Sequence, residues 1–338
     1  MSSKVEQIKN DLNKLLKADV IKLGNDEFFT KGRLNTGSLL LDELIGGYLL
    51  GRVVEFYGPM SVGKTSIAYR AVAEAQKKFE EKEVAFVDVE KTFDPNFAKM
   101  AGVDIDKLHL VVPEYGDRAI DVMNAMLYTN EYSLIVCDTV AALCTKRELD
   151  KTAEEKTMGE QAQLMSRGLR KLTAANNDTL IIFINQVREK IGVLYGSPTT
   201  TPGGRALGFY ASQRFELVRA SLIKMKIPKW SYEKEGFVEE ETPVGHVIAV
   251  RIKKDKVSGK ENSVCYIPFL YNIPELKDIY PGAEVGIDLV GEKIVLGLKN
   301  GEYVKSGAWY EVQGKEKKLR KNELRQLIVD QDEEVESD

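Results

Sequence analysis

Short apolar runs alternate with helical patterns through the first half of the chain. Five runs of strand length are rich in aliphatic and β-branched residues, and stretches with apolar residues at helical spacing separate them. Continuous apolar strands separated by helices are typical of a mostly parallel sheet covered on both faces. The predicted strands are residues 52–57, 84–88, 108–112, 134–137 and 179–185, and the helices between them include 64–80, 117–129 and 159–176. The pattern predicts an α/β fold.

The flanking segments have different patterns. Residues 5–16 place apolar residues on one helical face, which predicts an amphipathic helix outside the main domain. After residue 185, strands with turn signals at 213–218, 246–253 and 262–267 predict an antiparallel end of the sheet, and the acidic segment 233–241 predicts an inserted hairpin. The predicted division is 1–33 for the helix and its linker, 34–273 for the core, 274–329 for a small α+β domain, and 330–338 for an acidic disordered tail.

Composition restricts the class of protein. The chain has 338 residues and a net charge of −4. It has no apolar run of membrane-spanning length and no signal-peptide block, so we expect a cytoplasmic protein without a membrane partner. Three cysteines without CxxC spacing indicate a reducing compartment and no structural zinc.

The charge is unevenly distributed. Residues 164–230 carry eleven Lys or Arg against three acids, although the whole chain is acidic. Contact with nucleic acid therefore has to come from a local basic surface.

A phosphate-binding loop lies between a predicted strand and a predicted helix. The segment fits GxxxxGK[ST], whose glycines let backbone amides face phosphates, whose lysine adds charge and whose threonine ligates Mg²⁺. The nucleotide-binding residues are Gly58, Pro59, Met60, Ser61, Val62, Gly63, Lys64, Thr65 and Ser66. This motif predicts a site for ATP and Mg²⁺.

Two carboxylates end neighbouring apolar runs. Asp138 follows the strand 134–137, which would place it beside Thr65 to serve the magnesium ion. Glu90 follows the strand 84–88, and we interpret it as the base that orients the attacking water. A strand-end acid also acts as a helix cap, so that alternative is open from the residues alone.

An ordered series of motifs resembles the RecA family of recombinases and covers nearly the whole chain. In order, the matching segments are 35–39 (NTGSL), 51–55 (GRVVE), 93–95 (FDP), 138–143 (DTVAAL), 183–188 (FINQVR), 190–193 (KIGV), 203–204 (GG), 209–212 (FYAS) and 307–310 (GAWY). The resemblance implies a RecA-type ATPase core that forms helical homo-oligomeric filaments on single-stranded DNA and pairs it with homologous duplex DNA.

The resemblance also implies roles around the nucleotide. Asp94 and Phe97 would line the adenine pocket, although a tyrosine is more usual where Phe97 stands. Gln186 would sense the γ-phosphate and, with Lys64 and Glu90, take part in catalysis. Lys254 and Lys256 would reach the ATP of a neighbouring subunit. The amphipathic amino-terminal helix would pack on the next subunit.

The DNA surface would be built around the loop 192–208 and its flanks. Backbone amides, hydroxyls and charges there would contact phosphates. The implied DNA-binding residues are Arg170, Arg188, Lys190, Gly192, Ser197, Thr200, Thr201, Gly203, Gly204 and Arg205. Gln163 stands where an arginine is common, Arg205 where an asparagine is usual and Gly208 where a lysine is usual, which would redistribute affinity for DNA.

Two alternatives share the ATP site. One is a hexameric DNA-unwinding motor, and the other is a regulator that binds ATP and DNA without turnover. The loop 192–208 and the segment 307–310 favour the recombinase over the motor, and Lys64, Glu90 and Asp138 together favour an active ATPase over the regulator. The short carboxy-terminal unit and the substitutions relative to the family pattern also suit a phage-encoded member of the family, which would act in the host cytoplasm.

Overall fold

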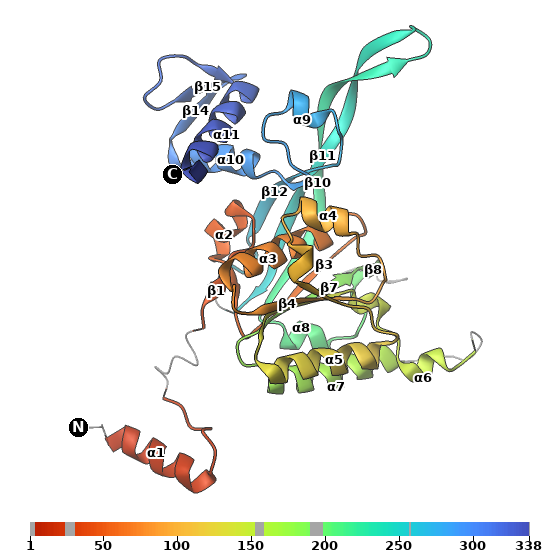
Figure 1. Ribbon diagram of the computed structural model, residues 1–338, viewed down its shortest axis with the longest axis vertical. Coiled ribbons are helices and arrows are strands. Elements are labelled where there is room, and N and C mark those ends of the chain that lie inside the picture. Colours follow the sequence, from red (N-terminus) through yellow and green to blue (C-terminus); the bar gives the residue numbers. More distant parts are fainter. Residues whose placement is uncertain (1–3, 24–30, 153–158, 190–198, 257, 338) are drawn as a thin grey trace.

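The computed structural model describes residues 4–23, 31–152, 159–189, 199–256 and 258–337, and Figure 1 shows its architecture. Within them, nine strands form one central sheet. From one edge to the other the strands are β13 (Gly286–Ile287), β12 (Val264–Leu270), β11 (Gly236–Asp255), β10 (Gln213–Ser231), β3 (Val53–Gly58), β7 (Leu180–Gln186), β6 (Tyr132–Asp138), β4 (Glu83–Asp88) and β5 (Leu108–Val111).

The sheet is parallel from β10 to β5 and antiparallel from β10 to β13. This arrangement confirms the predicted α/β fold with an antiparallel end. Because β3, β7, β6 and β4 are parallel neighbours, their carboxyl ends meet at one edge of the sheet, where ligands bind in open α/β folds.

Helices cover both faces of the sheet, and each face has its own apolar cluster. The cluster on one face includes Phe56, Ile67 and Phe86, and that on the other includes Ile120, Leu169 and Phe183. The helices on the first face are α2 (Leu39–Ile45), α3 (Lys64–Lys78) and α4 (Pro95–Met100), and those on the second are α5 (Gly116–Thr129), α7 (Glu160–Ala175) and α8 (Ala206–Tyr210).

Short elements join these layers. They are β1 (Arg33–Leu34) paired with β2 (Tyr48–Leu49), β8 (Arg188–Glu189) paired with β9 (Thr199–Thr200), the 3-10 helices η2 (Ile105–Lys107) and η3 (Val140–Ala142), and the helices α6 (Lys146–Leu149) and α9 (Leu276–Ile279). The amino-terminal helix α1 (Lys4–Leu16) confirms the predicted helix, and none of its residues is buried.

Strands β10 and β11 continue beyond the sheet as a two-stranded ribbon, residues 222–244, which projects from the body in Figure 1. Ile227 and Val244 bury the base of the ribbon against Leu276 and Tyr280. Three cross-strand ion pairs follow its length. They are Lys224–Glu241, Lys226–Glu239 and Lys229–Glu240. The predicted acidic hairpin is therefore the tip and one strand of a longer ribbon, whose other strand pairs three of its five glutamates.

The small carboxy-terminal unit contains α10 (Leu289–Asn300), β14 (Tyr303–Ser306), β15 (Trp309–Val312), β16 (Leu319–Arg320) and α11 (Lys321–Ser337). Its predicted start at residue 274 is too early, because β13 still belongs to the central sheet and Ile287 is buried in the main core cluster. Glu292 on α10 joins the unit to the core by accepting hydrogen bonds from the Ser38 hydroxyl at 2.6 Å and the Leu39 amide at 2.7 Å. Burial raises the pKa of Glu292 to about 7.

The acidic end also differs from the prediction. We expected residues 330–338 to be a disordered tail, but α11 continues to Ser337. Leu324 and Ile328 anchor the helix in the core of the small unit, and Asp332 forms an ion pair with Lys293 of α10. The buried anchor of α11 stabilises the whole helix, including its acidic end. The acidic residues alone do not indicate this, because the anchor lies earlier in the sequence.

Candidate nucleotide and nucleic-acid site

The phosphate loop lies between β3 and α3, as its motif predicts. Ser61 and Gly63 have positive φ values of 55° and 99°, which turn the backbone between the strand and the helix. A Cβ atom at Gly63 would lie 2.8 Å from Ile248 Cδ1, so only glycine fits this close approach. The side chain of Val62 is buried in the main core, which anchors the loop, whereas that of Met60 is exposed.

Lys64 is folded into its own loop. Its ammonium group donates to the carbonyl oxygens of Gly58 at 3.1 Å and Pro59 at 2.6 Å. The side chain is buried, and this burial lowers the pKa of Lys64. Desolvation disfavours the charged ammonium, so an anionic phosphate near Lys64 would relieve an electrostatic cost already present in the fold.

Thr65 and Asp138 meet as predicted. The Thr65 hydroxyl donates to Asp138 Oδ2 at 2.7 Å. The second carboxylate oxygen, Oδ1, is buried and has no hydrogen-bond partner among the described residues. Burial raises the pKa of Asp138 to about 6. A hydroxyl beside a buried carboxylate with an unsatisfied oxygen fits a hard divalent cation or its water shell, because such ions take oxygen ligands.

Glu90 and Gln186 are also brought together. The Gln186 side-chain amide donates to Glu90 Oε1 at 2.9 Å. The Thr139 hydroxyl donates to the same oxygen, also at 2.9 Å. The carboxylate after β4 is thus bonded to residues at the ends of β6 and β7.

The predicted adenine-pocket residues begin α4. Asp94 caps this helix by accepting from the amides of Asn96 and Phe97. The half-buried Phe97 ring lies 6.1 Å from the ring of Tyr69, which comes from α3. Sequence reasoning missed Tyr69, which lies one helical turn after Thr65 and links the aromatic cluster to the phosphate-loop helix.

The lysine pair Lys254 and Lys256 lies at the end of β11. Lys254 donates to the carbonyl oxygens of Gly208 at 2.8 Å and Phe209 at 3.0 Å. Burial, together with the charges of Lys256 and Arg214, lowers the pKa of Lys254. Lys256 is exposed. In the described residues, neither side chain bonds to the phosphate loop of its own chain.

Strand β8, which precedes the predicted DNA loop, pairs with β9, which lies within it. Arg188 on β8 lies opposite Thr200 on β9. Gly203 and Gly204 then adopt positive φ values of 83° and 74°, and a Cβ at Gly204 would lie 2.9 Å from Ala162 Cβ on α7. Of the other predicted DNA-binding residues, Lys190, Gly192 and Ser197 lie outside the described residues.

Gln161 on α7 connects the glycine pair to the nucleotide side, and sequence reasoning missed it. Its side-chain amide donates to the carbonyl of Val140 at 2.8 Å, and its carbonyl accepts from the Gly203 amide at 3.3 Å. Arg170 lies further along α7, where it is exposed and donates to the Ser166 carbonyl of its own helix. The structure therefore bonds Gly203 to this network and places Gly204 against Ala162 of the same helix, whereas Arg170 bonds only within α7.

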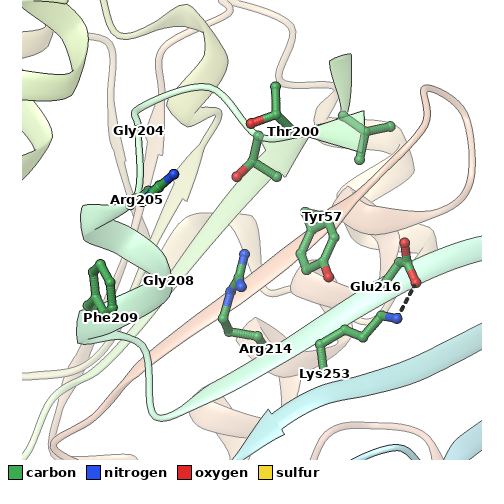
Figure 2. A pocket seen from close by; sticks show the side chains of 11 residues that line it. Tyr57, Thr200, Gly204, Arg205, Gly208, Phe209, Arg214, Glu216 and Lys253 are labelled. Carbon is green, nitrogen blue, oxygen red and sulfur yellow. Dashed lines mark ion pairs between the residues drawn. The ribbon is translucent and has the colours of Figure 1, made fainter. Parts of the chain in front are cut away.

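A cavity of about 620 Å³ lies beside the described part of the predicted DNA loop, residues 199–208 (Figure 2). Thr200, Thr201 and Arg205 line it from the loop side, and Arg214 and Lys253 line it from β10 and β11. The Arg214 guanidinium lies 5.0 Å from the centre of the Tyr57 ring and bonds to the fully buried Glu55. A Cβ at Gly208 would lie 3.3 Å from this guanidinium, so the glycine that replaces the usual lysine leaves room for Arg214.

A phosphate loop at the end of β3, with carboxylates at the ends of β6 and β4, defines the core of a P-loop ATPase. The model of the RecA N-terminal domain family matches residues 1–264. The chain is 39% identical over 311 residues to Protein RecA from Staphylococcus carnosus and to Protein RecA from Staphylococcus aureus. These matches cover 91% of the chain and 79% and 81% of the two relatives. The chain belongs to the RecA family.

Family membership decides between the alternatives left open by the sequence. The protein is a DNA-dependent ATPase and an ATP-dependent recombinase of DNA recombination and repair, rather than an unwinding motor or an inactive regulator. A nucleotide-binding site follows from this assignment. None of the helices in the described ranges combines the length with the apolar composition that a membrane span requires.

Proposed function

We propose that the chain binds ATP with Mg²⁺ at the phosphate loop, forms helical filaments on single-stranded DNA and pairs this DNA with homologous duplex DNA in the cytoplasm. The observation that carries the link between ATP and DNA is the Gln186–Glu90 hydrogen bond. Gln186 ends β7, and Arg188 begins the strand that leads into the DNA loop. A change at the nucleotide that moves Gln186 would thus reach Arg188, which lies only two residues further along the chain and is proposed to bind DNA.

Hydrolysis follows from the groups at the edge of the sheet. Glu90 accepts a proton from the water that attacks the γ-phosphorus, and the bond from this phosphorus to the ADP oxygen breaks. Lys64 and the amides of the phosphate loop bind the phosphate oxygens. A magnesium ion held by Thr65 and Asp138 would neutralise charge that develops on the leaving oxygen.

The remaining assignments concern the ATP of the next subunit, the adenine base and the DNA. Lys254 and Lys256 act on the ATP of the next subunit, for which Lys254 would exchange its bonds to the Gly208 and Phe209 carbonyls for phosphate oxygens. Asp94 and Phe97 bind the adenine. Arg188, Arg205 and the hydroxyls of Thr200 and Thr201 bind DNA phosphates, which makes binding dependent on salt and largely independent of sequence.

The decisive measurement is ATP hydrolysis with and without single-stranded DNA, with electron microscopy of the same samples. DNA stimulation together with helical filaments is expected. Stimulation with closed rings would contradict the filament proposal, and hydrolysis that DNA does not alter would contradict the proposed coupling.

Glu90→Gln tests the assignment of the base. The amide keeps the size of the side chain but cannot accept the proton, so we expect ATP binding to persist and kcat to fall by about 10²- to 10⁴-fold. Filaments should last longer because ATP is retained. Glu81→Gln, an exposed change just before β4 and therefore at the opposite end of the strand from Glu90, is the control. Parental kcat in Glu90→Gln would remove Glu90 from the role of base.

A further inference from the structure

Thr139 occupies a position that the proposed roles do not use. It directly follows Asp138 and is almost fully buried. Its hydroxyl donates to Glu90 Oε1 at 2.9 Å. We infer that Thr139 is a positioning residue for ATP hydrolysis, one that aims the Glu90 carboxylate at the attacking water; this inference rests on the proposed role of Glu90.

The bonding of the hydroxyl fixes the direction of its proton. The Ala141 amide donates to Thr139 Oγ1 at 3.1 Å, where Thr139 caps η3. A hydroxyl has one proton to donate and lone pairs that accept. Because the Ala141 amide occupies the accepting side, the proton of Thr139 is directed to Glu90.

The two donors to Glu90 share one oxygen. Thr139 and Gln186 both bond to Oε1, and among the described residues no protein donor contacts Oε2. Two bonds on one oxygen fix the plane of a carboxylate and leave the other oxygen to accept a proton. In this arrangement Oε1 accepts the hydrogen bonds that orient the Glu90 carboxylate, and Oε2 accepts the proton from the attacking water.

The two donors differ in how firmly they are placed. Thr139 is buried and accepts the Ala141 amide of η3, whereas Gln186 is only half-buried and its bond to Glu90 is exposed. If Gln186 turns toward a γ-phosphate, its bond to Glu90 is lost. Thr139 then remains to hold the carboxylate during the reaction, so its contribution is to kcat rather than to ATP binding.

The first comparison uses Thr139→Val and Thr139→Ser. Valine keeps the shape and removes the hydroxyl, whereas serine keeps both of its hydrogen bonds. We expect Thr139→Val to lower kcat of the full-length protein by roughly 10- to 100-fold with KM for ATP changed by less than about threefold. Thr139→Ser should restore kcat to within about threefold of the parent. A fall in Thr139→Ser as large as in Thr139→Val would overturn the inference.

Thr145→Val is a closely matched control. Thr145 is also buried and caps a short helix, accepts from the Glu148 amide at 3.0 Å and donates to a glutamate, Glu160, at 2.8 Å. Thr145→Val therefore removes one capping bond and one bond to a glutamate, as Thr139→Val does, but at a position away from the phosphate loop. We expect Thr145→Val to keep the parental rate of hydrolysis without DNA, and an equal loss in both variants would attribute the effect of Thr139 to capping alone.

A double mutant separates this inference from the role of Glu90. If Thr139 acts through the carboxylate, Thr139→Val in the Glu90→Gln background lowers kcat no further. A further fall of tenfold or more would show that Thr139 acts elsewhere and would overturn the inference. Normal kcat in Glu90→Gln would instead refute the proposed base. If Thr139→Val does not fold by circular dichroism, Thr139→Ala takes its place in the same cycle.

Discussion

The phosphate loop and the described part of the predicted DNA-binding segment, residues 188–189 and 199–208, are held in different ways. At the nucleotide side, the functional side chains bond to one another or to their own loop, as Lys64 does with Gly58 and Pro59 and Thr65 with Asp138. In the predicted DNA-binding segment, Arg188 and Arg205 are exposed, and the backbone is held where Arg188 pairs with Thr200 and where the Gly203 amide donates to Gln161.

The difference teaches where each site is sensitive. Truncation of one side chain in the nucleotide network leaves a buried partner unsatisfied, which is costly. Exposed cations act additively through many phosphate contacts, so each contributes little. The DNA side should therefore respond more to a change in backbone geometry at Gly204 than to loss of a single arginine.

The largest expected effect is at Lys64. Lys64→Ala removes the buried cation of the phosphate loop, and we expect it to abolish measurable phosphate binding and lower ATP turnover by about 100-fold or more. Titration with a fluorescent ATP analogue and steady-state hydrolysis measure the two effects. Lys77→Ala changes an exposed lysine of the same helix and should match the parent. If Lys64→Ala still bound ATP with parental affinity, Lys64 would not be a phosphate-binding residue.

Gly204→Ala should have an intermediate effect. The new methyl group would meet Ala162 Cβ at 2.9 Å in a left-handed backbone conformation, with a cost of about 1–2 kcal/mol. We expect affinity for single-stranded DNA, measured by fluorescence anisotropy, to fall about fivefold or more. At Gly314 the φ value is also 83°, but beyond its chain neighbours no described residue comes within 4 Å of an added Cβ, so Gly314→Ala controls for backbone strain alone. Equal DNA affinity in both variants would show that the contact with α7 is irrelevant to DNA.

Arg188→Ala should have a smaller effect. Loss of one phosphate contact is expected to weaken DNA binding uniformly across sequences and to reduce the slope of log K against log salt by about one. Binding isotherms at several salt concentrations give this slope, with the exposed Lys107→Ala as the control. An unchanged slope would place Arg188 outside the phosphate contacts.

Removal of residues 330–338 should have the smallest effect. It deletes negative charge, including Asp332 and its pair with Lys293, and we expect assembly onto duplex DNA to become a few times faster at low salt. Stopped-flow light scattering measures the rate, and Asp332→Asn isolates the contribution of the ion pair. If the truncated protein assembles at the parental rate, the acidic end does not compete with DNA.

The sequence predicted the parts that local patterns encode. The apolar runs became β3 to β7, and the phosphate-loop motif predicted its own strand, turn and helix. It could not predict that Thr139 and Gln161 join separate strands and loops, because these contacts depend on which strands are neighbours in the sheet. Thr139 did carry a signal, since a threonine before Val-Ala-Ala is typical of a helix cap.

Two errors share a physical cause. The ribbon is longer than the predicted hairpin, and the acidic end is helical rather than disordered. In both, exposed charged residues extend an element that is anchored elsewhere, at Ile227 in the ribbon and at Leu324 in α11. Apolar periodicity detects the anchor but not the extension, because the extension buries little surface.

The positions of the two tryptophans give the ribbon a practical use. Trp230 stacks edge-on against Phe237 near the ribbon tip, with ring centres 5.4 Å apart, and Trp309 lies under Arg320 in the small unit. These are the two tryptophans of the sequence, and neither lies in the body of the ATPase core. Tryptophan fluorescence therefore reports on the ribbon and the small unit, without a contribution from the core. Trp309→Phe would leave Trp230 on the ribbon as the one tryptophan fluorophore. Its emission wavelength would then show whether the ribbon tip is exposed to solvent or buried when the protein assembles.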